Sequence, residues 1–185
     1  MRLIGLSGSL RAGSYNTALL RAAQALTPPD VELIEGSIRD IPLYDGDVES
    51  ASGIPTAVTE LKDLIAGADG LILFTPEYNN GVPGVFKNAI DWLSRPASDI
   101  GRVFGGRPVA VLGASPGGFG TILSQNAWLP ILRTLGTAPW FEGRLMVARA
   151  GTVFDAEGNL IDEDIRKRLA GFIAGFAEHC RRTPR

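Results

Sequence analysis

Three glycine-rich loops carry the groups best suited to chemistry in this 185-residue sequence. In the first loop, residues 7–16, Gly8 and Gly13 permit tight turns and the close approach of a ligand. Arg11 adds a charge-assisted donor at the start of a predicted helix, where backbone amides point outward. This composition suits a phosphate monoester, and a polar loop with an exposed arginine is the alternative. The neutral hydrogen-bonding residues of the loop are Ser9, Ser14 and Asn16.

The second loop, residues 75–84, has a stiff backbone because it contains two prolines, of which Pro76 is the first. A flat, partly apolar ring needs a fixed backbone with directed amides, and Tyr78 and Asn79 are able to lie along the edge of such a ring. An ordinary strand-to-helix turn, bent at residues 80–81, is the alternative.

The third loop, residues 113–121, contains four glycines between Gly113 and Gly120. Backbone amides free of side chains can converge on a planar or anionic group, and a flexible glycine turn is the alternative. The three loops together favour a binding site more strongly than any one of them does.

Composition narrows the chemistry further. The formal charge of −2 and the pI of about 5.4 give no global positive field for nucleic acid or anionic lipid, so any anion site must be local. The single cysteine, Cys180, excludes an internal disulfide, and with the single histidine, His179, it cannot build a Cys/His zinc cluster. We expect His179 to be solvated at a helix end and Cys180 to be a packed thiol.

Short apolar segments alternate with helix-period segments along the chain, which predicts a parallel sheet covered by helices on both faces. Right-handed crossovers between five strands lead to the order 2-1-3-4-5, in which ligands bind beyond the carboxyl ends of strands 1 and 3. Each glycine-rich loop follows a strand in this scheme. The predicted strands are residues 3–6, 31–34, 71–74, 109–112 and 145–148.

Hydrophobic spacing also predicts the helices. We expect Pro55 in the first turn of one helix and Pro130 to kink or interrupt another. The closing helix has acidic residues at its start and arginines at its end, as the helix dipole favours. A small hairpin is predicted over residues 153–161. The predicted helices are residues 17–26, 54–68, 85–93, 121–135 and 162–182.

One domain over residues 1–185 is expected from the length of the chain. The N-terminal apolar stretch is too short for a signal peptide, and no apolar run approaches the roughly 18 residues of a membrane span. We therefore expect a cytoplasmic protein with no membrane or nucleic-acid partner.

In combination, the three loops resemble those of the NADPH-dependent FMN reductase family of flavodoxin-like proteins, which includes bacterial quinone, chromate and azo-dye reductases. The likeness runs from Arg2 to about Leu135. It implies an α/β, flavodoxin-like three-layer sandwich with a five-stranded parallel sheet. The matching motifs are Gly8-Ser9-Leu10-Arg11-x-Gly13-Ser14-x-Asn16, Pro76-Glu77-Tyr78-Asn79 with Pro83-Gly84, Lys87-Asn88-Ala89-Ile90-Asp91-Trp92, and Ser115 with Gly117-Gly118-x-Gly120.

The resemblance also implies which residues bind FMN. Glu77 and Tyr78 are expected to position ring and substrate rather than to transfer protons, and no catalytic side chain is required because the flavin N5 carries the hydride. The FMN phosphate is expected on Ser9, Arg11, Ser14 and Asn16, and the isoalloxazine ring on Pro76, Glu77, Tyr78 and Asn79, with Ser115 and Gly118 on its other side.

The implied activity is an FMN-dependent NAD(P)H oxidoreductase. It is expected to pass two electrons, by ping-pong hydride transfer through bound FMN, to a quinone, free flavin, azo compound or chromate. The alternatives are a flavodoxin-type electron carrier or FMN-binding regulator without NAD(P)H turnover, and a phosphate- or nucleotide-binding module without flavin. Arg95, Arg102 and Arg107 are candidate contacts for the 2′-phosphate of NADPH.

A homodimer or homotetramer is the expected assembly, because the family uses its second loop and the helix that follows as an interface. Tyr78, Phe86 and Trp92 give this region aromatic residues for such a contact. Burial of Phe86 and Trp92 in the core of their own subunit is the alternative.

Overall fold

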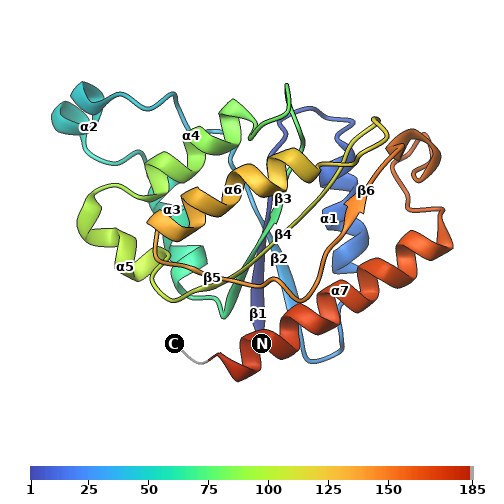
Figure 1. Cartoon of the computed structure of the whole chain (residues 1–185). Coiled ribbons are helices and arrows are strands. Elements are labelled where there is room, and N and C mark those ends of the chain that lie inside the picture. The colour runs from blue at the N-terminus through green and yellow to red at the C-terminus, as the bar shows by residue number, and fades with distance from the viewer. Residues whose placement is uncertain (184–185) are drawn as a thin grey trace.

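A parallel sheet lies between two layers of helices in the computed structural model, which describes residues 1–183 (Figure 1). The order β2-β1-β3-β4-β5, with every pairing parallel, confirms the predicted order. All five residues of β3 are buried, as expected for a strand covered on both faces. The strands are β1 (Arg2–Ser7), β2 (Glu32–Gly36), β3 (Gly70–Phe74), β4 (Pro108–Ala114), β5 (Ala138–Pro139) and β6 (Met146–Val147).

Two short strands share the last position of the sheet. β5 pairs with the start of β4, in the register Pro108↔Ala138, and β6 pairs with its end, in the register Gly113↔Met146. The fifth strand predicted at 145–148 is therefore correct for β6, while β5 is absent from the sequence prediction. A two-residue strand that contains a proline leaves neither length nor periodicity to detect.

The helices cover the two faces unequally in number. Ile72 and Phe74 of β3 pack in one apolar cluster with α1 and α7, whereas Leu71 and Leu73 pack in another with α3, α4 and α6. Successive strand residues alternate in this way because their side chains point to opposite faces. The helices are α1 (Tyr15–Gln24), α2 (Gly46–Ser52), α3 (Thr56–Ala66), α4 (Gly84–Leu93), α5 (Ile100–Val103), α6 (Ile122–Thr134) and α7 (Glu163–Arg182), with 3-10 turns η1 (Ala97–Asp99) and η2 (Ala150–Thr152).

Three details test the helix predictions. Pro55 is the N-cap of α3 rather than a residue of its first turn. α6 runs through Pro130 without interruption. At the start of α7, the Asp162 carboxylate accepts a hydrogen bond from the Ile165 amide at 2.9 Å, so this acidic residue caps the helix.

The end of α7 is less exposed than its sequence indicates. Cys180 is buried, as predicted, and burial raises the pKa of its thiol to about 12. His179 is half-buried, with its ring centroid 6.3 Å from that of Trp140, and its Nε2 has no hydrogen-bond partner within residues 1–183. The prediction of a solvated histidine is therefore wrong, because aromatic side chains pack beside it.

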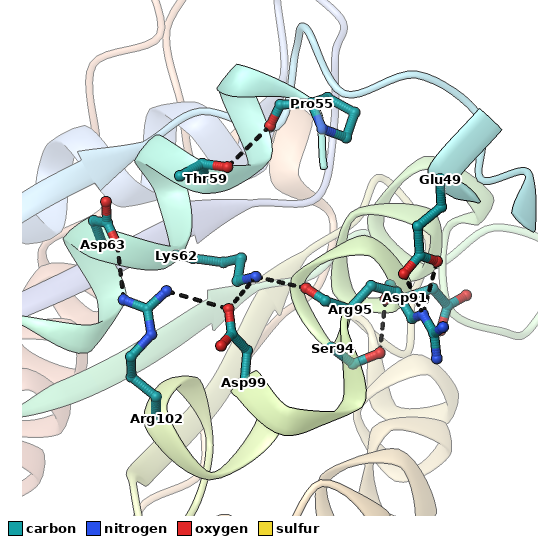
Figure 2. A network of polar contacts seen from close by, with 10 residues as sticks. All are labelled: Glu49, Pro55, Thr59, Lys62, Asp63, Asp91, Ser94, Arg95, Asp99 and Arg102. Atoms are coloured by element: carbon teal, nitrogen blue, oxygen red, sulfur yellow. Dashed lines mark hydrogen bonds and ion pairs between the residues drawn. The ribbon is translucent and has the colours of Figure 1, made fainter. Parts of the chain in front are cut away.

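A polar network joins α3 to the segment that follows α4 (Figure 2). Lys62 is almost fully buried, and its Nζ donates to Asp99 Oδ2 and to the Arg95 carbonyl, both at 2.5 Å. These contacts satisfy a buried ammonium that would otherwise be costly. Two outer ion pairs complete the network, Arg95–Glu49 at 2.8 Å and Arg102–Asp63 at 2.7 Å.

Two further predictions concern smaller features. A single antiparallel bridge between Phe154 and Leu160 confirms a minimal hairpin in residues 153–161. Among the helices of residues 1–183, none combines the length and the apolar character needed to cross a membrane.

Candidate functional site

The three glycine-rich loops meet at the carboxyl edge of the sheet. The first loop is held to the end of β3 by a hydrogen bond from the Gly8 amide to the Phe74 carbonyl at 2.9 Å. The second is tied to β4 by a bond from the Thr75 amide to the Leu112 carbonyl at 2.8 Å. Neighbouring parallel strands bring their carboxyl ends together, so loops far apart in sequence form one surface.

The first loop presents unused backbone donors at the start of α1. Ser14 caps the helix by accepting from the amides of Asn16 and Thr17. The amides of Ala12 and Gly13, just before this cap, donate to no group within residues 1–183. Free amides at a helix N-terminus suit an anionic group.

Two guanidinium groups accompany these amides. Arg11 is exposed and makes no ion pair with any described residue. Arg39, which sequence reasoning missed, donates from Nη2 to the Leu10 carbonyl at 2.9 Å and so brings a second cation to the loop. Arg39 lies shortly after β2, the neighbour of β1, and this adjacency is the signal that would have found it. The donor set therefore fits a phosphate dianion.

Close packing fixes the start of this loop. A Cβ atom built on Gly8 would lie 2.2 Å from Phe86 Cδ1, so only glycine fits there. Phe86 and Trp92 are fully buried, which supports their alternative interpretation as core residues of their own subunit. Tyr78 remains the exposed aromatic residue of this region, with 49% of its surface accessible.

Asn16 is buried, and both of its polar atoms bind the backbone of one residue. Its Nδ2 donates to the Ala114 carbonyl and its Oδ1 accepts from the Ala114 amide, each at 2.9 Å. The side chain therefore clamps α1 to the end of β4 through one bond at each of its polar atoms. This clamp supports the floor of the site.

The second loop contains a tight turn and a link to the first loop. Tyr78 and Gly81 form an antiparallel bridge, with Asn79 and Asn80 between them at φ values of 49° and 63°. The turn is therefore centred on Asn79 and Asn80, since asparagine tolerates the left-handed region. The Tyr78 hydroxyl donates to Ser9 Oγ at 3.3 Å, which joins two residues assigned to different parts of the site.

Pro76 and Glu77 precede this turn. Pro76, near the start of the loop, is buried. Glu77 accepts hydrogen bonds at Oε2 from the amides of Leu123 and Ser124, at 2.8 and 3.1 Å. Its carboxylate therefore contacts the first turn of α6 directly.

The third loop folds back on itself. Ser115 Oγ donates to the Gly120 carbonyl at 2.6 Å, and the Ser115 amide donates to the Val147 carbonyl of β6 at 3.0 Å. At Gly118, by contrast, a Cβ atom would meet no atom within 4 Å, so this part of the backbone faces open space. Arg149 lies beside the loop, where its amide donates to the Gly117 carbonyl.

None of the three arginines proposed for the 2′-phosphate of NADPH lies free at this edge. Arg107 directly precedes β4, at the opposite edge of the sheet, and is fully buried with its guanidinium on the carbonyls of Val103 and Ala68. That prediction is wrong for Arg107. Arg95 and Arg102 are engaged by carboxylates of the network in Figure 2.

A separate apolar cavity of about 560 Å³ lies beside the loops rather than between them. It is bounded by α6 and by the segment from β5 to β6, at the outer edge of the sheet. Residues along it include Val111, Leu129, Trp140, Phe141, Arg144 and Met146.

A parallel sheet in this order, with three loops converging at its carboxyl edge, defines a flavodoxin-like α/β protein. The family model for NADPH-dependent FMN reductases matches residues 1–152. An NAD(P)H-dependent FMN reductase of Pseudomonas aeruginosa is 44% identical over 169 residues, covering 91% of this chain and 89% of that protein. A quinone reductase of Escherichia coli is 36% identical, with coverage of 99% and 97%.

Structural comparison gives the same result. FerB, a flavoenzyme NAD(P)H:(acceptor) oxidoreductase from Paracoccus denitrificans, has a TM-score of 0.87 and 33% identity to this chain, with 98% of each chain covered. The chain belongs to the NADPH-dependent FMN reductase family, and it is accordingly an oxidoreductase of the class that uses FMN and NAD(P)H.

Proposed function

We propose that this protein is an FMN-dependent NAD(P)H oxidoreductase that reduces a quinone or a similar acceptor. One observation carries the proposal: the unused amides of Ala12 and Gly13 lie beside unpaired Arg11, where the other two loops converge. Such a donor set suits an FMN phosphate.

The proposed site uses the residues that the family motifs indicate. Asn16 and Glu77 also support the site through their hydrogen bonds to Ala114 and to α6, and we expect the exposed groups of the loops to contact the cofactor. The phosphate is assigned to Ser9, Arg11, Ser14 and Asn16, the isoalloxazine ring to Pro76, Glu77, Tyr78 and Asn79, and its other side to Ser115 and Gly118.

FMN, when bound, supplies two-electron chemistry with NAD(P)H and then with the acceptor, in a ping-pong order. The protein's own task is to hold the cofactor and to leave a face accessible. Exposed Tyr78 and the open backbone at Gly118 support such an accessible face. Initial rates measured against both substrates are expected to give parallel double-reciprocal lines, and intersecting lines would exclude the ping-pong order.

The names of two relatives support a quinone as the acceptor. The Escherichia coli relative is a quinone reductase, and a Burkholderia relative that is 36% identical is a 2-hydroxy-1,4-benzoquinone reductase. Azo compounds, chromate and free flavin extend the proposal to other acceptors of the same electrons. A carrier or regulator that binds FMN without NAD(P)H turnover is the competing function.

A visible absorption spectrum is the decisive experiment. FMN-loaded protein is expected to lose its flavin bands on anaerobic addition of NADPH and to regain them with benzoquinone. Bands that NADPH leaves intact would establish the carrier or regulator instead. A chain that binds no FMN after incubation with the cofactor would overturn the proposed site.

We also propose a cytoplasmic homodimer or homotetramer built from one domain over residues 1–185, with no nucleic-acid or membrane partner. Exposed apolar side chains along α6 and the adjoining segment support self-association. Multi-angle light scattering is expected to give a mass of two or four chains, and a monomer mass would exclude it. These side chains are Ile122, Leu123, Leu129 and Phe141.

A further inference from the structure

Helix α6 lacks the N-terminal cap that its own sequence could supply. Its N-cap residue, Thr121, makes no side-chain capping hydrogen bond. Glu77 takes this role from 46 positions away, since its Oε2 accepts from the amides of Leu123 and Ser124 at 2.8 and 3.1 Å. A carboxylate at this position satisfies two otherwise unpaired amides and complements the positive end of the helix dipole.

Buried contacts beneath Glu77 reinforce the same junction. The Thr75 hydroxyl lies 2.9 Å from Ser124 Oγ and accepts from Trp128 Nε1 at 3.0 Å. Thr75, Ser124 and Trp128 are all fully buried. In addition, a Cβ atom on Gly113 would lie 2.0 Å from the Thr75 carbonyl oxygen, so the second and third loops begin in direct contact.

Glu77 thereby connects the two loops assigned to opposite sides of the flavin ring. The third loop ends where α6 begins, so fixing the first turn of α6 also fixes the end of that loop. The neighbouring residue, Tyr78, holds the second loop to the first through Ser9. Adjacent side chains of one motif therefore connect the second loop to both of the others.

We propose that Glu77 is a positioning residue whose carboxylate, by capping α6, sets the spacing of the second and third loops around FMN. This inference rests on the proposed function, because it assumes FMN between these loops. It adds to the ring position proposed for Glu77 an action through helix α6.

Asp162 provides a matched control. It caps α7 with the same chemistry, a carboxylate oxygen 2.9 Å from the Ile165 amide, and lies outside the three loops. Four variants are compared with the wild-type protein: E77Q, E77A, D162N and D162A. For each variant, FMN affinity is measured by fluorescence titration, the bound-FMN absorption spectrum is recorded, and KM and kcat are determined with NADPH and benzoquinone.

We expect E77A to weaken FMN binding by about fivefold or more, the equilibrium factor that a lost helix cap represents, and to alter the bound-FMN spectrum. E77Q is expected to lie between E77A and the wild type, because its amide oxygen still accepts hydrogen bonds but carries no charge. Both Asp162 variants are expected to lose thermal stability while keeping the FMN affinity and spectrum of the wild type.

Three outcomes would overturn the proposal. In the first, the Glu77 variants have the same FMN affinity and spectrum as the wild type or the Asp162 variants. This outcome leaves the proposed function intact. The second is failure of E77Q to fold, judged by near-ultraviolet circular dichroism, because Glu77 would then be a folding residue. The third is a wild-type chain that binds no FMN, and only this outcome removes the proposed function as well.

Discussion

At the scale of single residues, Gly8 shows how tightly the phosphate loop is built. Replacing Gly8 with alanine places a methyl group 2.2 Å from Phe86 Cδ1, and the Phe86 ring is fully buried. We expect a loss of about 1–3 kcal/mol in the free energy of unfolding, as overpacking typically produces, together with weaker FMN binding. Urea denaturation and a fluorescence titration measure the two effects.

Gly13 in the same loop is the control for this prediction. The nearest atom to a Cβ at Gly13 is 3.6 Å away, an ordinary contact with the end of the Arg11 side chain. Gly13→Ala is therefore expected to keep wild-type stability. Equal stability of the two alanine variants would contradict the packing argument.

Arg11 is expected to discriminate FMN from riboflavin. Since its guanidinium has no protein partner within the described residues, Arg11→Met should weaken FMN binding by roughly tenfold or more, the magnitude of a lost charge-assisted contact. Riboflavin has no phosphate, so its affinity should not change. Parallel titrations with both flavins test this, with Arg21→Met on the exposed side of α1 as the control; an equal loss for both flavins would place Arg11 elsewhere in the site.

The sequence predicts where the polar residues of the site lie better than it predicts what they bind. Asn16, Glu77 and Ser115 all lie within the three loops, yet the side chain of each forms hydrogen bonds with protein groups. These partners are 98, 46 and 5 residues away, and spacing along the chain cannot reveal the first two. The exposed donors, by contrast, follow from residue type and loop position alone.

At the scale of secondary-structure elements, the Asn16 clamp joins α1 to β4. Asn16→Ala would leave the Ala114 amide and carbonyl without their buried partner. We expect the free energy of unfolding to fall by about 2 kcal/mol or more, because unsatisfied buried polar groups carry this order of penalty. Urea denaturation is the measurement. The exposed Asn126→Ala on α6 is the control, and equal losses in both variants would exclude the clamp.

The network of Figure 2 makes a second prediction about elements. Asp99→Asn leaves the buried Lys62 ammonium without its charged partner and is expected to lower the thermal midpoint, whereas Lys62→Met removes the buried charge itself and should cost less. Differential scanning calorimetry of both variants tests this order. The reverse order would show that Asp99 contributes little to the burial of Lys62.

The Lys62–Asp99 pair also makes the stability of the fold depend on pH. The hydrogen bond from Lys62 holds the pKa of the Asp99 carboxyl below its ordinary value of 3.8. A depressed carboxyl pKa contributes stability that is present above the unfolded-state value and is lost as the pH falls through the folded-state value. The difference in thermal midpoint between the wild type and Asp99→Asn should therefore persist at neutral pH and shrink below about pH 4.

Elements were predictable to the extent that they bury apolar residues at a regular period. Strands β1, β3 and β4 and helices α3 and α7 do so, and the sequence predicts all five. Helix α2 buries no residue, so hydrophobic periodicity gives no signal for it. β5 has only two residues, which is too short for any period.

At the scale of the whole molecule, the packing of α7 onto the sheet makes Cys180 a reporter of folding. Burial raises the pKa of this thiol to about 12, so the native protein at pH 8 should hold almost no thiolate and resist an aromatic disulfide reagent. In guanidinium chloride the single cysteine should react fully. Rapid reaction of the native protein at pH 8 would show that α7 detaches readily.

The raised pKa of the Cys180 thiol also makes the stability of the fold depend on pH. The unfolded chain releases the proton near the ordinary thiol value of 9.0, before the folded chain does. The stability contributed by the neutral thiol is thus complete below that value and is lost as the pH rises toward about 12. The thermal midpoint of the wild type should fall more steeply over this interval than that of Cys180→Ala.

The divided last position of the sheet also affects how the protein behaves in concentrated solution. β5 and β6 have two residues each, and β5 ends in a proline that cannot donate to a further strand. The opposite edge, β2, carries exposed Glu32 and Glu35. Short, proline-containing and charged edges are poor templates for pairing with another chain. The shortness of β5, which prevents its prediction from the sequence, therefore also protects the sheet against edge-to-edge aggregation.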